Sequence, residues 1–149
     1  MSDPHESTTV GYSVDVSGGR PELDQRLSDE LDRVNATATP GVAPARELTV
    51  RVLDAEGELA AGLSGWTWGV AAGIAMTWVR EASRGDGLGR RLLAEFESEA
   101  RSRGATHVFV TSFTFQAPGF YERHGYREIF RWDGVPTEGT ADVHLRKEL

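Results

Sequence analysis

The sequence contains no cysteine, and this absence excludes several kinds of chemistry. A chain without thiols has no disulfide bonds, no thiolate metal ligands and no cysteine nucleophile. Its four histidines show no close spacing, so no metal site is predicted from them. Because disulfide-free chains are typical of the reducing cytosol, we expect a cytoplasmic protein.

Long apolar runs are also absent. No segment approaches the ~20 consecutive apolar residues of a membrane-spanning helix. The start, Met1–Thr9, is polar and acidic and lacks the apolar block of a signal peptide, so residues 1–10 are expected to form a flexible tail. Basic residues are outnumbered by acidic ones, 16 to 23. The net charge of −7 disfavours nucleic acid and acidic membranes as partners and favours a cationic substrate such as an amine.

What is present is ordinary for one globular domain, expected over residues 11–149. Period-two alternation predicts a first strand at 12–16, and apolar residues at helical spacing predict a helix beginning at Pro21. Strands are expected at 48–52, 59–68, 71–79, 107–111, 126–132 and 141–147, with helices from 88 to near Gly104 and at 118–124. A run of antiparallel strands followed by a β–α–β unit predicts an α+β domain.

The segment 79–91 is the most informative part of the chain. Gly85, Gly87 and Gly89 alternate just before a predicted helix, and arginines stand on both sides of them. Alternate glycines allow backbone N–H groups to converge on one point, because no Cβ atom intervenes. The helix adds its unpaired N–H groups and the positive end of its dipole. This pattern predicts a binding site for a phosphate or pyrophosphate.

Other loops share alternating glycines. A Walker A loop requires Gly-Lys-Ser/Thr and is excluded, since Arg90 follows Gly89. A Rossmann loop follows the first strand of a parallel sheet, whereas this loop follows antiparallel strands. Taken alone, the segment is equally consistent with a structural turn that carries solvated arginines.

The pattern Arg84-x-x-Gly87-x-Gly89 resembles the acyl-CoA pyrophosphate loop of the GNAT N-acetyltransferase superfamily. Residues 117–126 are similar to that family's segment with Ala and Tyr-Glu-Lys-Leu-Gly-Phe/Tyr, and residues 144–149 resemble its terminal strand in small bacterial members. The resemblance extends from about Glu47 to Leu149. It implies a mixed, mostly antiparallel sheet of about seven strands, with helices on both faces and a splay between strands four and five.

The resemblance also implies how acetyl-CoA, the expected co-substrate, is bound without a metal. The backbone of Thr77, Trp78 and Val79 would pair with pantetheine along a bulged strand. The pyrophosphate would be bound by the backbone N–H groups of Gly85, Gly87, Gly89 and Arg90 and by arginine side chains, among Arg84, Arg90 and Arg91. Thr114 stands where many family members have asparagine, and its hydroxyl can still hydrogen-bond pantetheine.

Tyr121 stands where the family places a phenol near the thioester sulfur, and its hydroxyl could donate a proton to the leaving thiolate. A tyrosine that merely packs its ring is the alternative. Glu81 is the first carboxylate to consider as a general base, although a solvated surface glutamate or a water chain are alternatives. Trp66 and Trp68 lie on one side of a strand and could form either an aromatic wall for the acceptor amine or part of the core.

The function implied by the resemblance is direct transfer of an acetyl group from acetyl-CoA to a primary amine of a small molecule. A catalytically idle acyl-CoA-binding or sensor module is the alternative from another class, and a protein-amine acetyltransferase is the alternative within the enzyme class. A homodimer is common in such folds. Neither the acceptor nor the oligomeric state follows from the residues.

Overall fold

The structure is a computed structural model that describes residues 11–149. It divides into two compact units, one ending at Pro40 and one spanning Gly41–Leu149, which are described separately below. The tail expected at 1–10 lies outside the described residues. A single domain over 11–149 stays a prediction. No helix of residues 11–149 is long and apolar enough to cross a membrane.

The first unit contains one helix, α1 (Pro21–Ala38), as its apolar spacing predicts. Pro21 fixes a backbone angle suited to a first helical residue, and Glu22 and Asp24 place negative charge at the positive end of the helix dipole. No residue of α1 is buried. Its apolar stripe is about half exposed or more along its length: Leu23, Leu27, Leu31 and Val34.

The strand predicted at 12–16 is wrong. Only Tyr12 makes an isolated bridge, and residues 13–16 have no regular structure. The three alternating apolar side chains Tyr12, Val14 and Val16 satisfy the period of a strand, but they are 75%, 46% and 88% exposed. Alternating apolar residues stabilise a strand only where a neighbouring strand pairs with it and one of its faces is buried. Residues 13–16 have neither.

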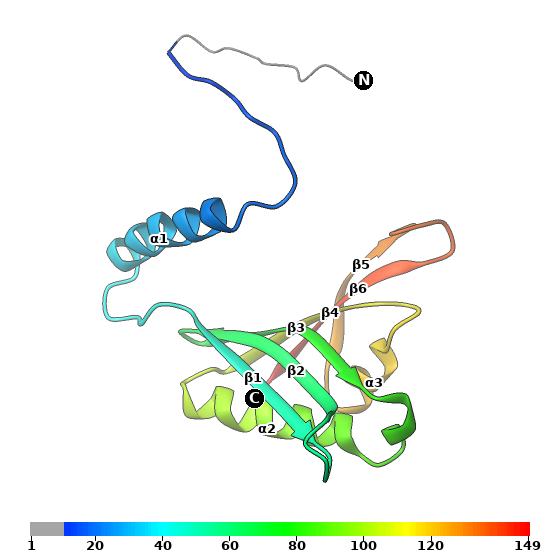
Figure 1. Cartoon of the computed structure of the whole chain (residues 1–149). Helices are drawn as coiled ribbons and strands as arrows, with labels where there is room; N and C mark the ends of the chain where they lie inside the picture. Colours follow the sequence, from blue (N-terminus) through cyan, green and yellow to red (C-terminus); the bar gives the residue numbers. More distant parts are fainter. Residues whose placement is uncertain (1–10) are drawn as a thin grey trace. The chain divides into compact units, whose positions relative to one another are not determined.

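The second unit is built on a six-stranded sheet, one strand fewer than the expected seven (Figure 1). The strands are β1 (Arg46–Leu53), β2 (Leu59–Trp68), β3 (Ala71–Val79), β4 (His107–Phe113), β5 (Arg127–Asp133) and β6 (Ala141–Glu148). Their spatial order is β1-β2-β3-β4-β6-β5, and every neighbouring pair is antiparallel except β3 and β4. The mixed, mostly antiparallel α+β fold is therefore confirmed.

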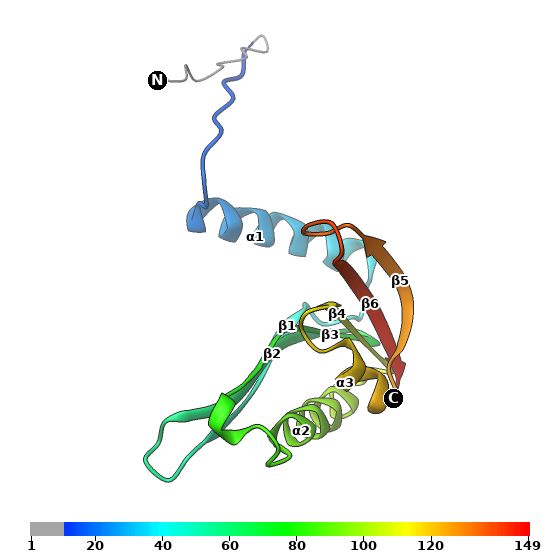
Figure 2. The same ribbon diagram turned by 90° about the vertical axis from the view of Figure 1, so that its right-hand side faces the viewer.

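Two helices, α2 (Leu88–Ser102) and α3 (Pro118–Arg123), pack on the same face of this sheet (Figure 2). The α2 helix lies against β1, β2 and β3 and buries its apolar stripe of Leu92, Leu93, Phe96 and Ala100. The α3 helix packs beside β4, β5 and β6. Within Gly41–Leu149 the two helices thus cover one face of the sheet. Helices on both faces stay a prediction for the whole chain.

A buried carboxylate ties α2 to the far strands of the sheet. Glu97 is 6% exposed and accepts hydrogen bonds from the Tyr126 hydroxyl at 3.0 Å and from the Lys147 ammonium at 3.0 Å to each oxygen. Burial, together with the adjacent carboxylate, raises the pKa of Tyr126 well above its ordinary value. The Tyr126 hydroxyl therefore stays protonated and donates its hydrogen bond to Glu97.

The parallel strands β3 and β4 separate after a short contact. They pair only over Ala71–Ile74 and His107–Val110. On its other edge β3 stays paired with β2, where Met76 lies opposite Ser64 and Ile74 opposite Gly65, so Ala75 is an extra residue in β3. This bulge turns the strand and leaves the edge of residues 76–79 without a strand partner. The splay expected between the fourth and fifth predicted strands, 71–79 and 107–111, is therefore present, between β3 and β4.

Candidate functional site

A cavity of about 910 Å³ lies where β3 and β4 diverge. Its walls come from residues 74–79 of β3, the segment 83–90 that follows, residues 110–112 of β4, and the segment 115–123 that ends in α3. The splay thus creates the cavity, and the glycine-rich loop and α3 enclose it.

Most of the residues singled out in the sequence meet in this cavity. Those that line it are Thr77, Trp78, Val79, Arg84, Gly85, Gly87, Gly89, Arg90 and Tyr121. Glu81, Thr114, Trp66 and Trp68 do not belong to its walls. The structure therefore brings the anion loop and the phenol together and leaves the weaker candidates outside.

The glycines of the loop have two different structural roles. Gly85 and Gly87 have φ angles of 94° and 77°, in the left-handed region that other residues rarely adopt. Gly89 has an ordinary backbone, but a Cβ there would lie 3.3 Å from the ring of Phe120. Two glycines shape the loop, and the third lets α2 and α3 approach each other.

The start of α2 is open to an anion. Gly87 precedes the helix and provides no side-chain cap, and the first helical bond runs from the Arg91 N–H to the Gly87 carbonyl at 3.0 Å. The N–H groups of Leu88, Gly89 and Arg90 therefore have no acceptor within the helix. The first turn contains no acidic residue to offset the helix dipole.

The arginines around the loop are not equivalent. Arg80 pairs with Asp54 at 2.8 Å, and Arg91 pairs with Glu95 at 3.3 Å. Arg84 uses its Nε to donate to the Val79 carbonyl at 3.3 Å. Within residues 11–149, Arg84 and Arg90 have no acidic partner, and both line the cavity. The positive charge available to an anion here is thus that of Arg84 and Arg90, whereas Arg91 lies outside the walls.

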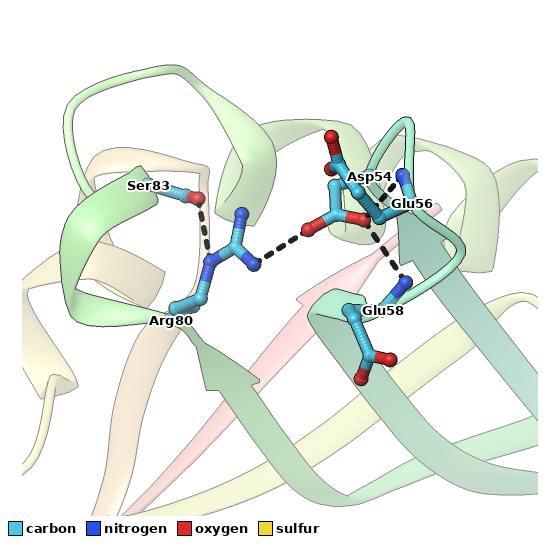
Figure 3. A network of polar contacts seen from close by, with 5 residues as sticks. All are labelled: Asp54, Glu56, Glu58, Arg80 and Ser83. Carbon is cyan, nitrogen blue, oxygen red and sulfur yellow. Dashed lines mark hydrogen bonds and ion pairs between the residues drawn. The ribbon is translucent and has the colours of Figure 1, made fainter.

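The loop is anchored to the β1–β2 turn by a polar network (Figure 3). One oxygen of Asp54 accepts from the backbone N–H groups of Glu56 and Glu58 at 3.0 and 2.9 Å, and the other accepts from Arg80 Nη1 at 2.8 Å. The Nε of Arg80 donates to the Ser83 hydroxyl at 3.2 Å. The hydrogen bond from Arg80 holds the pKa of Asp54 below its ordinary value. The beginning of the loop is therefore fixed by contacts that the glycines themselves cannot make.

Tyr121 belongs to the cavity wall and is 6% exposed. Its hydroxyl donates to the Thr77 hydroxyl on β3 at 3.2 Å, and its ring packs edge-on against Phe120 and Tyr126. Burial raises the pKa of Tyr121, and the bond to Thr77 offsets only part of that effect. The phenol thus stays protonated at neutral pH and can act as a proton donor.

The remaining predicted residues have other contacts. The Thr114 hydroxyl accepts from the Ala141 N–H at 3.1 Å, joining the end of β4 to β6. Glu81 begins the short 3₁₀ helix η1 (Glu81–Ser83) and is exposed.

Because the neighbouring Gly65 and Thr67 face α2, Trp66 and Trp68 lie on the opposite side of β2. Trp66 covers Gly73, where a Cβ would come within 2.3 Å of its ring.

Several wall residues were missed by sequence reasoning, among them Phe115, Phe120 and Arg123. Phe115 stacks on Phe113 with ring centroids 5.4 Å apart. Phe120 and Arg123 are three residues apart on a helix, so they share a face, and this spacing could have identified Arg123 from Phe120. No group of three or more histidine, aspartate or glutamate side chains suited to a metal occurs in the described part of the chain.

Comparison with known proteins agrees with this geometry. The Acetyltransferase (GNAT) domain family matches residues 46–128. The chain belongs to the GNAT family. It is therefore an acyltransferase of small bacterial type, a class that uses acetyl-CoA.

Individual relatives lead to the same family. The chain is 40% identical over 133 residues to blasticidin-S acetyltransferase of Streptomyces morookaense, covering 84% of this chain and 95% of that protein. Its structure is similar to that of an acetyltransferase from Agrobacterium tumefaciens, with a TM-score of 0.80, 27% identity and coverage of 91% and 98%. An acetyltransferase from Bacillus cereus gives a TM-score of 0.76 at 29% identity, with coverage of 91% and 98%.

Proposed function

We propose that this GNAT protein transfers an acetyl group directly from acetyl-CoA to a primary amine of a small molecule, with Tyr121 as the proton donor to the leaving thiolate. The observation that supports this most is the shared cavity. It joins an anion-binding helix start to a buried, protonated phenol beside the free edge of a strand.

Each part of acetyl-CoA has a complementary part of the cavity. The N–H groups at 85–90 and the unpaired charges of Arg84 and Arg90 suit the pyrophosphate. The free edge of Thr77–Val79 offers backbone groups to the amides of pantetheine. The thioester would then lie near Tyr121, on the opposite side of the gap between the strands.

In the proposed reaction the neutral amine nitrogen attacks the thioester carbonyl carbon, so that a C–N bond forms and the C–S bond breaks. The departing thiolate takes the proton of the Tyr121 hydroxyl. Because burial raises the pKa of Tyr121, the proton is present throughout the neutral range. The amine gives its own proton to water, and a proton from water restores the Tyr121 hydroxyl before the next turnover.

The route for the amine proton is proposed to be a water chain. None of the described residues that line the cavity is an aspartate, a glutamate or a histidine. Glu81, the first carboxylate considered, lies outside these walls. A chain of waters from the open cavity mouth needs no such side chain.

The first acceptor to test is blasticidin S. The relative that is 40% identical over most of both chains is named for its acetylation, and an amine acceptor suits a protein of net charge −7. A polyamine, an amino acid and a peptide with a free N-terminus complete a panel that separates small molecules from protein amines. Release of coenzyme A reports turnover with each of them.

Tyr121→Phe tests the role of the phenol. Removing a general acid of this kind is expected to lower kcat about 100-fold while acetyl-CoA affinity changes less than about twofold. Tyr126→Phe is a matched control, since it removes a buried phenol that bonds Glu97 and lies outside the cavity walls. We expect this control to lose thermal stability and keep its kcat.

Two results would contradict the proposal. An unchanged kcat in Tyr121→Phe would remove the phenol from the chemistry. Tight coenzyme A binding by the wild type with no turnover of any amine on the panel would favour the idle binding module instead.

A further inference from the structure

The cavity contains a third arginine that the proposed contacts with pyrophosphate and pantetheine do not use. Arg123 is the last residue of α3 and is exposed, yet it lines the same cavity as Arg84 and Arg90. It comes from a different element than the other two. The cavity wall therefore receives positive charge from α3 as well as from the glycine loop and the start of α2.

The guanidinium of Arg123 is directed back along its own helix. Its Nη1 lies 3.4 Å from the point where a Cβ of Gly119 would stand, one turn earlier in α3. Gln116, Ala117 and Phe120, at the beginning of this helix, all line the cavity. The absence of a side chain at Gly119 thus leaves room for the charged group along the cavity wall.

The glycine loop lies close to this helix. Phe120, one turn before Arg123, contacts the Gly89 position at the start of α2, at 3.3 Å from where a Cβ would be. Side chains three residues apart on a helix are neighbours. Arg123 is thus adjacent to the anion loop without being part of it.

The charge of Arg123 is not used within the protein. Among residues 11–149, Arg123 makes no ion pair, in contrast to Arg80, Arg91 and Arg103, which pair with Asp54, Glu95 and Glu99. An arginine on a cavity wall without an acidic partner is suited to a phosphate, which its planar group can bind through two hydrogen bonds. The ligand expected there is a second anionic group.

Coenzyme A carries such a group. Besides the pyrophosphate it has a 3′-phosphate on the ribose, one sugar away, with a charge near −2 as a phosphate monoester. We propose that Arg123 binds this 3′-phosphate, so that the cavity selects coenzyme A over 3′-dephospho-coenzyme A. The inference rests on the proposed function, because it requires the pyrophosphate to lie at the glycine loop.

The test compares two ligands and three proteins. The dissociation constants of coenzyme A and of 3′-dephospho-coenzyme A are measured by calorimetry for the wild type, Arg123→Gln and Arg101→Gln. Arg101 is the matched control, an exposed arginine near the end of α2 that lies outside the cavity walls. Thermal melting of each variant checks that the fold is kept.

We expect the wild type to bind coenzyme A about tenfold more tightly than the dephospho form, and Arg123→Gln to bind both with the affinity the wild type has for the dephospho form. Arg101→Gln should keep the preference. Arg123→Lys, which retains the charge without the planar fork, should keep part of it. Raising the salt concentration should reduce the preference to the same extent in the wild type and in Arg101→Gln.

Other outcomes overturn specific steps. If Arg123→Gln weakens both ligands equally, Arg123 contacts the pyrophosphate or supports the fold, and the inference is wrong. It is equally wrong if the wild type does not distinguish the ligands. If the wild type binds neither ligand, the proposed function and this inference both fail. The wild type alone shows that result, whereas failure of the inference by itself appears only in the comparison of the two ligands.

Discussion

The two long helices α1 and α2 carry similar apolar stripes and have very different surroundings. In α2 the stripe of Leu92, Leu93, Phe96 and Ala100 is at most 2% exposed. In α1 the corresponding stripe is between 49% and 62% exposed. A periodic pattern therefore determines that a helix forms and which face is apolar, whereas burial depends on what the rest of the chain places against that face.

The first turns of α1 and α2 differ in their charge. The first turn of α1 contains Glu22 and Asp24, which neutralise its own dipole. The first turn of α2 contains no acidic residue and carries Arg90 instead. The start of α2 thus remains available to an external anion, whereas the start of α1 carries its own negative charge.

The largest expected effect concerns burial. Leu92→Ala removes a side chain that is fully buried against the sheet and should lower the free energy of unfolding by about 3–5 kcal/mol. Leu27→Ala in α1 removes the same atoms from a side chain that is 50% exposed and should cost less than about 1 kcal/mol. Urea unfolding of both variants measures the difference.

The comparison would fail if both substitutions cost the same. A loss of about 3 kcal/mol in Leu27→Ala would mean that the α1 stripe is covered in solution. Concentration dependence of that loss would identify a second copy of the chain as the cover, since only an intermolecular contact responds to dilution.

A smaller effect is expected at the start of α2. Arg90→Glu gives α2 the acidic first turn of α1 and reverses a charge on the cavity wall, so acetyl-CoA affinity should fall about 100-fold. The same change favours the helix dipole, so the melting temperature should stay level or rise. Titration calorimetry and thermal melting together separate the two effects.

Glu22→Arg is the reciprocal change in α1. It should lower helix stability by a few tenths of a kcal/mol and leave acetyl-CoA affinity unchanged, because it alters the first turn of α1 and no residue of the Gly41–Leu149 unit. An equal loss of affinity in both variants would show that net charge, and not the local site, governs binding.

Much of the second unit could be predicted from the sequence. Each of its strands and helices follows from local periodicity, and the glycine loop, Tyr121 and the splay follow from the sequence and its resemblance to the GNAT family. The glycine loop depends on a short pattern, three alternating glycines at the start of a helix, which became distinct from a plain structural turn through the resemblance of residues 117–126. The bulge at Ala75 was implied by the resemblance and is present.

The rest depends on contacts between distant segments. The pattern at 12–16 is that of a strand, but no strand pairs with it. The arginines at 80 and 91 look equivalent to those at 84 and 90 until Asp54 and Glu95 are seen to neutralise them. Arg123 shares a helix face with Phe120, and that spacing identifies it only once α3 is seen to line the cavity.

The smallest effect concerns how each helix start is held. In α1 the side chain of the preceding Arg20 bonds, among the described residues, to Asp15 and Ser17, its close neighbours in the chain. The loop before α2 is held by Asp54, which lies 26 residues before Arg80. Asp54→Asn keeps an oxygen for the backbone N–H groups of Glu56 and Glu58 and removes the charge that faces Arg80. We expect the KM for acetyl-CoA to rise about threefold with kcat unchanged.

The pH dependence sharpens this last prediction. The hydrogen bond from Arg80 lowers the pKa of Asp54. The stability that the ionised carboxylate contributes is therefore complete above its unfolded pKa of ~3.9, and it is lost only as the pH falls through the lower pKa of the folded state. The threefold difference between Asp54→Asn and the wild type should therefore be constant from pH 6 to about pH 8. Asp86→Asn, in the same loop and without an ion pair among the described residues, is the control. A KM raised equally by Asp86→Asn would show that the loop responds to its total charge, and that the long-range anchor has no separate effect.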